Sequence, residues 1–291
     1  MKSLRSILIL LAIVASMAAC ASADAVKMPA VSGQAPISQR DTLDIATSNV
    51  PGDPWKCIVV RPQQYSADGD TARYPVVYLL NGYSGNHTTW PTVQPAIDSL
   101  ATAYGMIFVC PDGRDSWYWD SPEVPEMRME SAIVNDLIPA IDSLYRTDAT
   151  RGARAVTGLS MGGQGAMWLS MRHPDLFGSA GTTSGGVDIR PFPKKWKMAK
   201  WLGEEAANQK RWDDQAIVNV ARSLEPGQLN LIIDCGVDDF FAGVNADLHQ
   251  VLLDRKIPHD YISRPGAHTK DYWRNSILYQ LQFFNECFKR R

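Results

Sequence analysis

The sequence predicts one α/β domain built on an open, mostly parallel, doubly wound sheet with helices on both faces. Short, continuous apolar runs such as 76–80 and 106–110 are typical of strands that are buried on both faces. Amphipathic helical patterns alternate with these runs, and this order indicates parallel strands joined by helical crossovers. The chain has 291 residues, of which 45% are apolar, enough to bury the core of one such domain.

The N-terminal residues have the pattern of an export signal. Two basic residues, a short apolar run and an Ala-Ser-Ala cleavage site at 21–23 predict a signal peptide over 1–23, and hence a periplasmic or extracellular protein. The residues before Cys20 also resemble a bacterial lipobox, so a lipid anchor at that cysteine is the alternative. Residues 24–40 are small and polar and predict a linker, which leaves 41–291 as the folded domain.

Composition excludes several classes of function. The net charge is −2 and no basic run is interleaved with aromatic residues, so nucleic acid is not an expected partner. No segment after the signal reaches the ~18 apolar residues of a membrane-spanning helix. The chain contains no Cys-x-x-Cys or His-Glu-x-x-His pair, so no metal is expected. The four remaining cysteines fall singly in apolar runs and are expected to be buried free thiols.

The predicted elements follow one another in a regular order. Strand patterns occupy 42–47, 55–60, 76–80, 106–110, 155–157, 179–184, 229–233 and 259–263. Helical spacing occupies 93–104, 133–144, the residues after Met161, 244–252 and 272–288. An insertion at 185–228 has sparse apolar residues among charges, which predicts either a cap over the site or a helical pair packed on the sheet edge.

A Gly-x-Ser-x-Gly motif joins one predicted strand to the next helix. It reads Gly158-Leu159-Ser160-Met161-Gly162. In this context the serine lies on a sharp turn, where a Cβ on either glycine would collide with the neighbouring strand or helix. The turn exposes Ser160 as a nucleophile and leaves the Met161 N–H at a helix N-terminus. A glycine-rich loop without a catalytic role is the alternative.

Two more stretches place an acid and a base after predicted strands. Asp238 and Asp239 follow the strand at 229–233, and His268 follows the strand at 259–263. The carboxyl ends of parallel strands meet at one edge of the sheet, which is where an open α/β sheet binds its ligand. The chain order Ser, Asp, His is that of the α/β-hydrolases.

The chain resembles the esterase D-like branch of the α/β-hydrolases, which includes S-formylglutathione hydrolases, secreted feruloyl and acetyl-xylan esterases, and mycolyltransferases. The segments YPVVYLLNGYSG, GLSMGGQGA, DCGVDDFF and PGAHTKDYW support the resemblance. It implies that Ser160 is the nucleophile, His268 the general base and Asp239 the acid that orients the histidine. It also implies an oxyanion hole formed by the N–H groups of Tyr83 and Met161, and no cofactor.

Three acidic residues lie near the end of the strand that precedes the predicted acid. Related sequences have the acid three residues after a glycine, and counting from Gly236 selects Asp239. Asp234 is expected to remain within the strand. Asp238 is expected to face the other way and to cap the helix that begins near Ala242.

The substrate is less well determined by the sequence. Trp117 and Tyr118 lie in a long loop after a strand, and we expect them either to contact a sugar or aromatic acid or to pack beneath the loop. Asn81 stands where the family usually has His, which leaves the local hydrogen-bond pattern open. The predicted function is a secreted serine carboxylesterase for acetyl or feruloyl groups on carbohydrate. The alternatives are an acyltransferase to a sugar acceptor and a non-catalytic carbohydrate-binding protein.

Overall fold

The computed structural model describes residues 39–52, 54–66 and 71–290. The predicted signal peptide and the candidate anchor residue Cys20 lie outside the described residues, as does the predicted linker up to residue 38. Residues 39 and 40 belong to the first strand of the domain instead of the linker. Among the described residues, no helix combines the length and the apolar character needed to cross a membrane.

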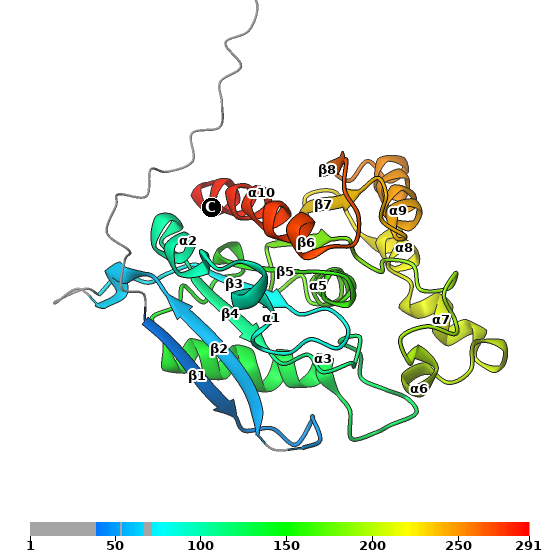
Figure 1. Ribbon diagram of the computed structural model, residues 1–291, viewed down its shortest axis with the longest axis horizontal. Helices are drawn as coiled ribbons and strands as arrows, with labels where there is room; N and C mark the ends of the chain where they lie inside the picture. The colour runs from blue at the N-terminus through cyan, green and yellow to red at the C-terminus, as the bar shows by residue number, and fades with distance from the viewer. Residues whose placement is uncertain (1–38, 53, 67–70, 291) are drawn as a thin grey trace, which may run out of the picture. The chain divides into compact units, whose positions relative to one another are not determined.

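An eight-stranded sheet forms the centre of the domain (Figure 1), in the order β1-β2-β4-β3-β5-β6-β7-β8. β2 is antiparallel to both β1 and β4, whereas the other neighbouring strands run parallel. The sheet confirms the predicted fold class, and every predicted strand is present, the strand at 76–80 with the predicted ends and the others with at least one end shifted. The strands are β1 (Gln39–Ile45), β2 (Trp55–Arg61), β3 (Val76–Leu80), β4 (Ile107–Pro111), β5 (Arg154–Gly158), β6 (Ser179–Thr183), β7 (Asn230–Gly236) and β8 (His259–Arg264).

Helices lie between the strands in the predicted order. The pattern at 93–104 is divided around Pro95 into two helices, and the second helix ends at Gly105, whose φ of 60° suits glycine. A π-helical segment, Ala132–Leu137, joins α3 to α4. The helices are α1 (Thr89–Val93), α2 (Ile97–Tyr104), α3 (Met129–Ser131), α4 (Ile138–Leu144), α5 (Met161–Arg172), α6 (Met198–Leu202), α7 (Gln209–Gln215), α8 (Ile217–Val220), α9 (Ala242–Asp254) and α10 (Lys270–Lys289).

Each face of the sheet has its own core. Along β3, Tyr78 and Leu80 point into one cluster of buried side chains and Val77 and Leu79 into the other, as the alternation of a strand requires. The first cluster includes side chains of α4, α5, α8 and α9, and the second those of α1, α2 and α10. Burial on both faces explains why β3 is apolar throughout.

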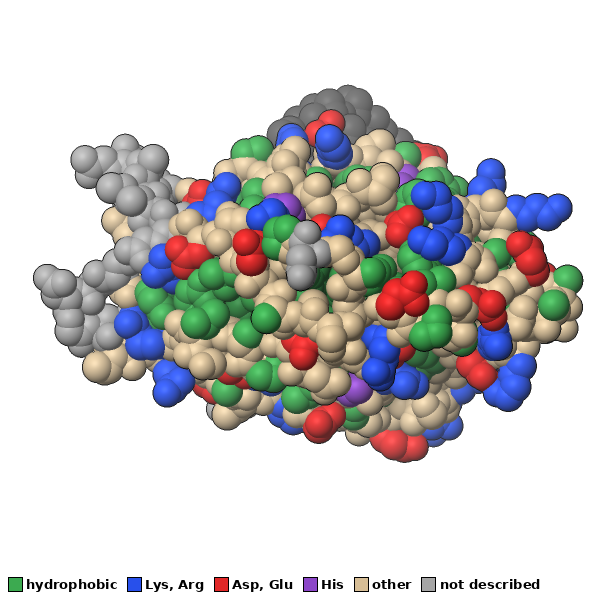
Figure 2. Space-filling model, turned by 90° about the horizontal axis from the view of Figure 1, so that it is seen from below, with side chains coloured by type: hydrophobic (Ala, Val, Ile, Leu, Met, Phe, Trp, Pro, Cys, Tyr) green, Lys and Arg blue, Asp and Glu red, His purple; other side chains and the backbone are tan. Residues whose placement is uncertain are grey.

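The insertion at 185–228 contributes to the core. Trp201, Trp212 and Ile217 are each no more than 1% exposed and belong to the cluster that also contains α5 and α9. The segment therefore packs through its apolar residues against other helices of this core, because α8 contacts both α5 and α9. On the face of the molecule shown in Figure 2, basic and acidic side chains are interspersed.

The cysteine prediction is confirmed within the described residues. Cys57, Cys110, Cys235 and Cys287 are buried free thiols. Cys57 belongs to one core cluster and Cys110 to the other, so the sheet itself separates these two neighbouring thiols. Burial raises the pKa of the Cys235 thiol, which keeps it protonated.

Candidate active site

Ser160 lies on the sharp turn between β5 and α5. Its φ of 57° and ψ of −119° are unusual for a residue with a side chain, and its own N–H is held by Thr183 O at 2.9 Å. A Cβ on Gly158 would overlap the backbone of Gly162, and one on Gly162 would overlap Leu80 O. These overlaps confirm the prediction that a residue with a Cβ does not fit at either glycine of the motif.

His268 forms hydrogen bonds with both Ser160 and Asp239. Its Nε2 lies 3.0 Å from Ser160 Oγ, and its Nδ1 lies 2.9 Å and 3.1 Å from the two carboxylate oxygens of Asp239. An ionised carboxylate only accepts hydrogen bonds, so Nδ1 carries the proton and Nε2 of the neutral ring accepts from the serine hydroxyl. The structure therefore assembles the three predicted residues in one hydrogen-bonded chain.

The acid in this chain is Asp239 and not one of its neighbours. Its side chain is fully buried, and its Oδ1 also accepts the Phe241 N–H at 2.9 Å. Asp238 is exposed, and α9 begins after Phe241 without a side-chain cap, so the predicted capping role of Asp238 is wrong. The turn at Asp239 takes the place of that cap. Asp234 lies within β7, as expected.

Backbone hydrogen bonds join the loops that carry the acid and the base. Val237 N donates to Arg264 O at 3.0 Å, and Asp238 N donates to Gly266 O at 2.9 Å. These bonds extend the β7–β8 pairing beyond the ends of both strands. The backbone therefore helps to fix the distance between Asp239 and His268, in addition to the hydrogen bonds between their side chains.

A buried carboxylate beneath these loops provides a second connection. Asp234 accepts hydrogen bonds from Tyr272 Oη at 2.5 Å, Ser276 Oγ at 2.6 Å and Arg264 Nη2 at 2.7 Å. Burial raises the pKa of Asp234, and the bonds from Ser276 and Tyr272 oppose that effect. The network ties β7 and β8 to the first turns of α10, and so fixes the elements on both sides of His268.

Tyr83 and Met161, whose N–H groups are the predicted oxyanion donors, lie on two segments near Ser160. Met161 is the first residue of α5, and Tyr83 lines the same cavity as Ser160. Among the described residues, the Tyr83 N–H, which lies in a turn, donates to no backbone or side-chain acceptor, and the Met161 N–H donates to none outside α5. Two such donors beside the hydroxyl of Ser160 are able to bind a developing oxyanion.

Asn81 connects the Tyr83 loop to the loop that follows β4. Its Oδ1 accepts the Gly113 N–H at 2.8 Å, and its Nδ2 donates to Gly82 O at 2.9 Å. The Tyr118 hydroxyl donates to Asn81 O at 3.0 Å, and burial raises the pKa of that hydroxyl, which therefore keeps its proton. This asparagine, where the family usually has His, thus holds the Tyr83 loop in place.

Trp117 and Tyr118 lie in the core, so the prediction that they contact substrate directly is corrected. They are 1% and 0% exposed, and neither lines the cavity at Ser160. Trp117 stacks on Trp119 at 5.6 Å and donates from Nε1 to Trp196 O at 3.3 Å. The alternative, packing beneath the loop, is the arrangement observed.

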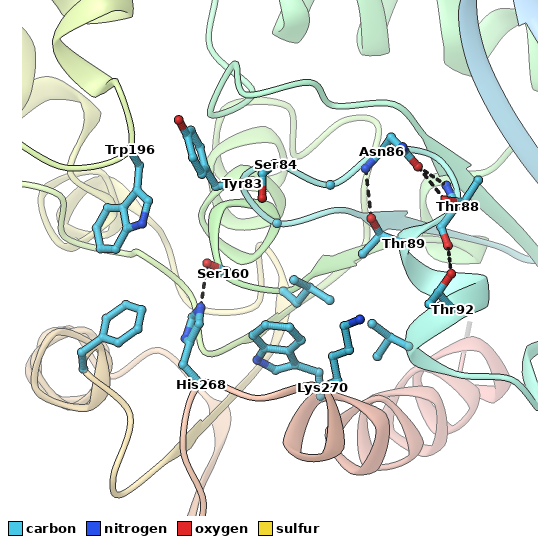
Figure 3. A pocket seen from close by; sticks show the side chains of 16 residues that line it. Tyr83, Ser84, Asn86, Thr88, Thr89, Thr92, Ser160, Trp196, His268 and Lys270 are labelled. Carbon is cyan, nitrogen blue, oxygen red and sulfur yellow. Dashed lines mark hydrogen bonds between the residues drawn. The ribbon is translucent and has the colours of Figure 1, made fainter.

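A cavity of about 660 Å³ opens above Ser160 (Figure 3). Trp196, Phe240, Trp273 and Lys270 line it, and sequence reasoning singled out none of the four as a site residue. Phe240 directly follows the predicted acid, and Lys270 and Trp273 follow the predicted base within five residues. Their closeness in the sequence to these two residues could have indicated that they line the site. The signal for Trp196 was the hypothesis that the insertion forms a cap. The other residues in contact with the cavity are Gly82, Tyr83, Ser84, Gly85, Asn86, Thr88, Thr89, Thr92, Val93, Leu159 and His268.

Aromatic rings surround the imidazole. The ring centres of Phe240 and Trp273 lie 4.3 Å and 5.0 Å from that of His268. Phe240 also stacks on Trp196, with 5.6 Å between the ring centres. Phe240 is nevertheless 52% exposed. The rings restrict the imidazole to one orientation and present an apolar wall to a ligand.

The family of the chain follows from a comparison with known proteins. A model of the family described as "Putative esterase" matches residues 48–284, which include Ser160, Asp239 and His268. The chain belongs to this esterase family. The match confirms the resemblance found in the sequence and makes the protein an enzyme of the serine hydrolase class, acting on carboxylic esters.

Two curated relatives differ in how much of their length this chain matches. An acetyl esterase of Caldicellulosiruptor saccharolyticus is 26% identical over 238 residues, which cover 77% of this chain and 88% of the relative. An endo-1,4-beta-xylanase/feruloyl esterase of Xylanibacter ruminicola is 31% identical over 148 residues, which cover 46% of this chain and 20% of the relative. The chain thus matches most of the first relative and a fifth of the second.

Solved structures show the same fold. A ferulic acid esterase aligns with a TM-score of 0.72 at 24% identity, over 86% of this chain and 98% of the other. An S-formylglutathione hydrolase from Agrobacterium tumefaciens aligns with a TM-score of 0.73 at 20% identity, over 86% and 96%. These alignments confirm the α/β-hydrolase fold predicted from the chain order of the three residues.

Proposed function

We propose that this protein is an exported serine carboxylesterase that removes acetyl or feruloyl groups from carbohydrate. The observation that supports this most directly is the hydrogen-bonded chain from Ser160 through His268 to the buried Asp239, at the base of an open cavity. Membership in the esterase family supports the reaction class, and the acetyl and feruloyl esterases among the relatives support the acyl groups.

In the proposed reaction, the Ser160 Oγ–H proton passes to His268 Nε2 as Oγ forms a bond to the ester carbonyl carbon. The carbonyl oxygen becomes an oxyanion and accepts hydrogen bonds from the Tyr83 and Met161 N–H groups. Asp239 keeps the Nδ1 proton directed at its carboxylate, which stabilises the imidazolium that forms. The C–O bond to the alcohol then breaks, and the alcohol oxygen takes the proton from Nε2.

Water completes the cycle by the same steps. His268 Nε2 takes a proton from the water as its oxygen attacks the acyl-enzyme carbonyl, and the bond to Ser160 Oγ breaks as Oγ recovers that proton. The N–H groups of Tyr83 and Met161 again receive the oxyanion. Every proton transfer uses groups of this chain, the substrate or water, so the proposed mechanism requires no cofactor.

The walls of the cavity support a substrate with an apolar or aromatic acyl part and a hydroxyl-rich alcohol part. Tyr83 and Trp196 lie on one side of Ser160 in Figure 3, and Thr89 and Thr92 lie on the other. Aromatic faces bind the planar rings of hydroxycinnamates and the apolar faces of sugars. Threonine hydroxyls both donate and accept, as sugar hydroxyls do.

Export is part of the proposal because the start of the chain has the pattern of a signal peptide. The N-terminal sequence and mass of the mature protein, purified from the culture medium and from the membrane fraction, test this part. A mature N-terminus at Asp24 supports cleavage after Ala23. A mass that includes diacylglycerol on Cys20 supports the anchor.

The role of the aromatic wall is tested with Trp196→Ala. We expect kcat/KM for methyl ferulate to fall about ten-fold, and that for p-nitrophenyl acetate to fall by less, because only the larger acyl group extends to the indole. The panel contains both esters and acetylated and feruloylated xylan, with and without a free sugar acceptor. Product analysis by chromatography separates hydrolysis from transfer.

Leu253→Ala is the matched control, because Leu253 is 50% exposed and lies outside the cavity. Equal losses on every ester after Trp196→Ala would contradict a role in acyl selection and would indicate a structural role. No turnover of any ester by the wild-type protein would contradict the proposed function itself.

A further inference from the structure

The cavity at Ser160 has an uneven charge. Lys270 is the one Lys or Arg among the described residues that line it, and no Asp or Glu is among them. The carboxylate of Asp239 lies near but is fully buried and paired with His268. Of the charged groups in the described residues, a ligand in the cavity therefore meets one ammonium group and no exposed carboxylate.

The ammonium group of Lys270 is available to a ligand. Lys270 is exposed and forms no ion pair with any other described residue. The adjacent acid, Asp271, pairs instead with Arg274 Nη1 at 3.2 Å, and its side chain is 90% exposed. Within the described part of the chain, no partner therefore neutralises Lys270 before a substrate arrives.

Lys270 lies on the side of the cavity that carries the hydroxyl groups of Thr89 and Thr92. In Figure 3 its side chain rises from the start of α10 on the side of Thr89 and Thr92, whereas Trp196 lies across Ser160 from it. The two helices that carry them, α1 for the threonines and α10 for Lys270, contact each other. The ammonium and the threonine hydroxyls thus form one polar wall beside the nucleophile.

We propose that this polar wall is a subsite for a carboxylate, and that Lys270 gives the enzyme a preference for acidic esters. The substrate class is an acyl ester that carries a second, free carboxylate, either on the alcohol, as in a uronic acid, or on the acyl chain, as in a dicarboxylic half-ester. A carboxylate binds the ammonium by charge and accepts a hydrogen bond from the Thr89 hydroxyl, which itself accepts the Asn86 N–H at 3.0 Å. The Thr92 hydroxyl already donates to Thr88 O at 2.8 Å and adds polarity to the wall. The inference rests on the proposed function, because it names the substrate class of the same site.

Two matched pairs of esters distinguish the sources of the carboxylate. Acetylated methyl glucuronoside against acetylated methyl glucoside tests the alcohol, and p-nitrophenyl hemisuccinate against p-nitrophenyl butyrate tests the acyl chain. The readout is the charged-to-neutral ratio of kcat/KM within each pair. Because both esters of a pair are measured on the same sample, the concentration of correctly folded enzyme cancels in the ratio.

We expect Lys270→Gln to lower the ratio about five-fold in at least one pair, and Lys270→Glu to lower it further, because the sign of the local charge is reversed. The wild-type ratio is expected to fall toward that of Lys270→Gln at 1 M salt, where the screening length is only about 3 Å. Lys289→Gln is the control. It removes the same charge from the other end of α10, about 28 Å away along the helix at 1.5 Å per residue.

Ligand-detected NMR of methyl glucuronoside, methyl glucoside, succinate and butyrate measures the same preference without turnover. It decides the inference even if the wild-type protein hydrolyses none of the esters, which would contradict the proposed function separately. Ratios that are the same in wild type, Lys270→Gln and Lys270→Glu, in both pairs and in binding, would overturn the carboxylate subsite. An equal loss with Lys289→Gln would also overturn it, because net charge would then be the cause.

Discussion

Ser160→Ala is expected to lower ester turnover by about 10⁴-fold or more with little change in folding, because the three hydrogen-bonded residues act as a unit. Removing Oγ removes the atom that forms the acyl-enzyme, while the strained turn and its backbone bonds remain. Steady-state kinetics on p-nitrophenyl acetate and the thermal midpoint of each purified protein measure the two effects.

Ser84→Ala is the matched control for this experiment. Ser84 lines the same cavity, and its φ of 62° is similar to the 57° of Ser160, so both substitutions place alanine at a positive φ. A small effect is expected at Ser84. Retention of a tenth of wild-type activity by Ser160→Ala would contradict the nucleophile assignment, as would a larger loss at Ser84 than at Ser160.

Asp239→Asn is expected to lower turnover by about 10⁴-fold, because an amide at this position no longer selects the tautomer with Nδ1 protonated. Asp238→Asn, one residue away, is expected to leave turnover within a few-fold, since its side chain is exposed and caps no helix. The adjacent pair therefore makes a controlled test of one carboxylate against another. Turnover and melting temperature are measured together.

The two aspartate variants also test the register of the loop. An inactive Asp238→Asn protein beside an active Asp239→Asn protein would show that the acid is assigned to the wrong residue. If both variants lose activity together with their melting transition, a third variant, Asp239→Glu, separates the causes. It keeps the charge, so partial recovery of turnover without recovery of stability supports the orienting role.

The parts of the fold with strong local signals were predicted from the sequence. The continuous apolar run of β3 is predictable because both faces of that strand are buried, and the turn at Ser160 because only glycine fits on either side of it. The acid and the base follow strands, where topology alone brings them to one edge of the sheet. The break in the helix around Pro95 was missed because apolar spacing continues across it.

The walls of the site were not predictable because they depend on contacts between distant segments. Trp117 and Tyr118 look like ligand contacts in the sequence, yet Gly113 and Gly165 have no side chains and leave room for the buried Tyr118 ring. Trp196 reaches the cavity from the insertion and meets Phe240 there. No periodicity in the chain relates these residues, so only the folded structure shows which aromatic residues are exposed to a ligand.

The measurement that tests the central claim most directly is the site of reaction with an alkyl fluorophosphonate, which forms a stable ester with an activated serine. Mass spectrometry of the digested wild-type protein is predicted to show one adduct, on Ser160, with loss of ester turnover in proportion to labelling. Ser160→Ala is predicted to remain unlabelled. Complete inactivation with the Ser160 peptide unmodified, or an adduct on another residue that accounts for the loss of activity, would contradict the account.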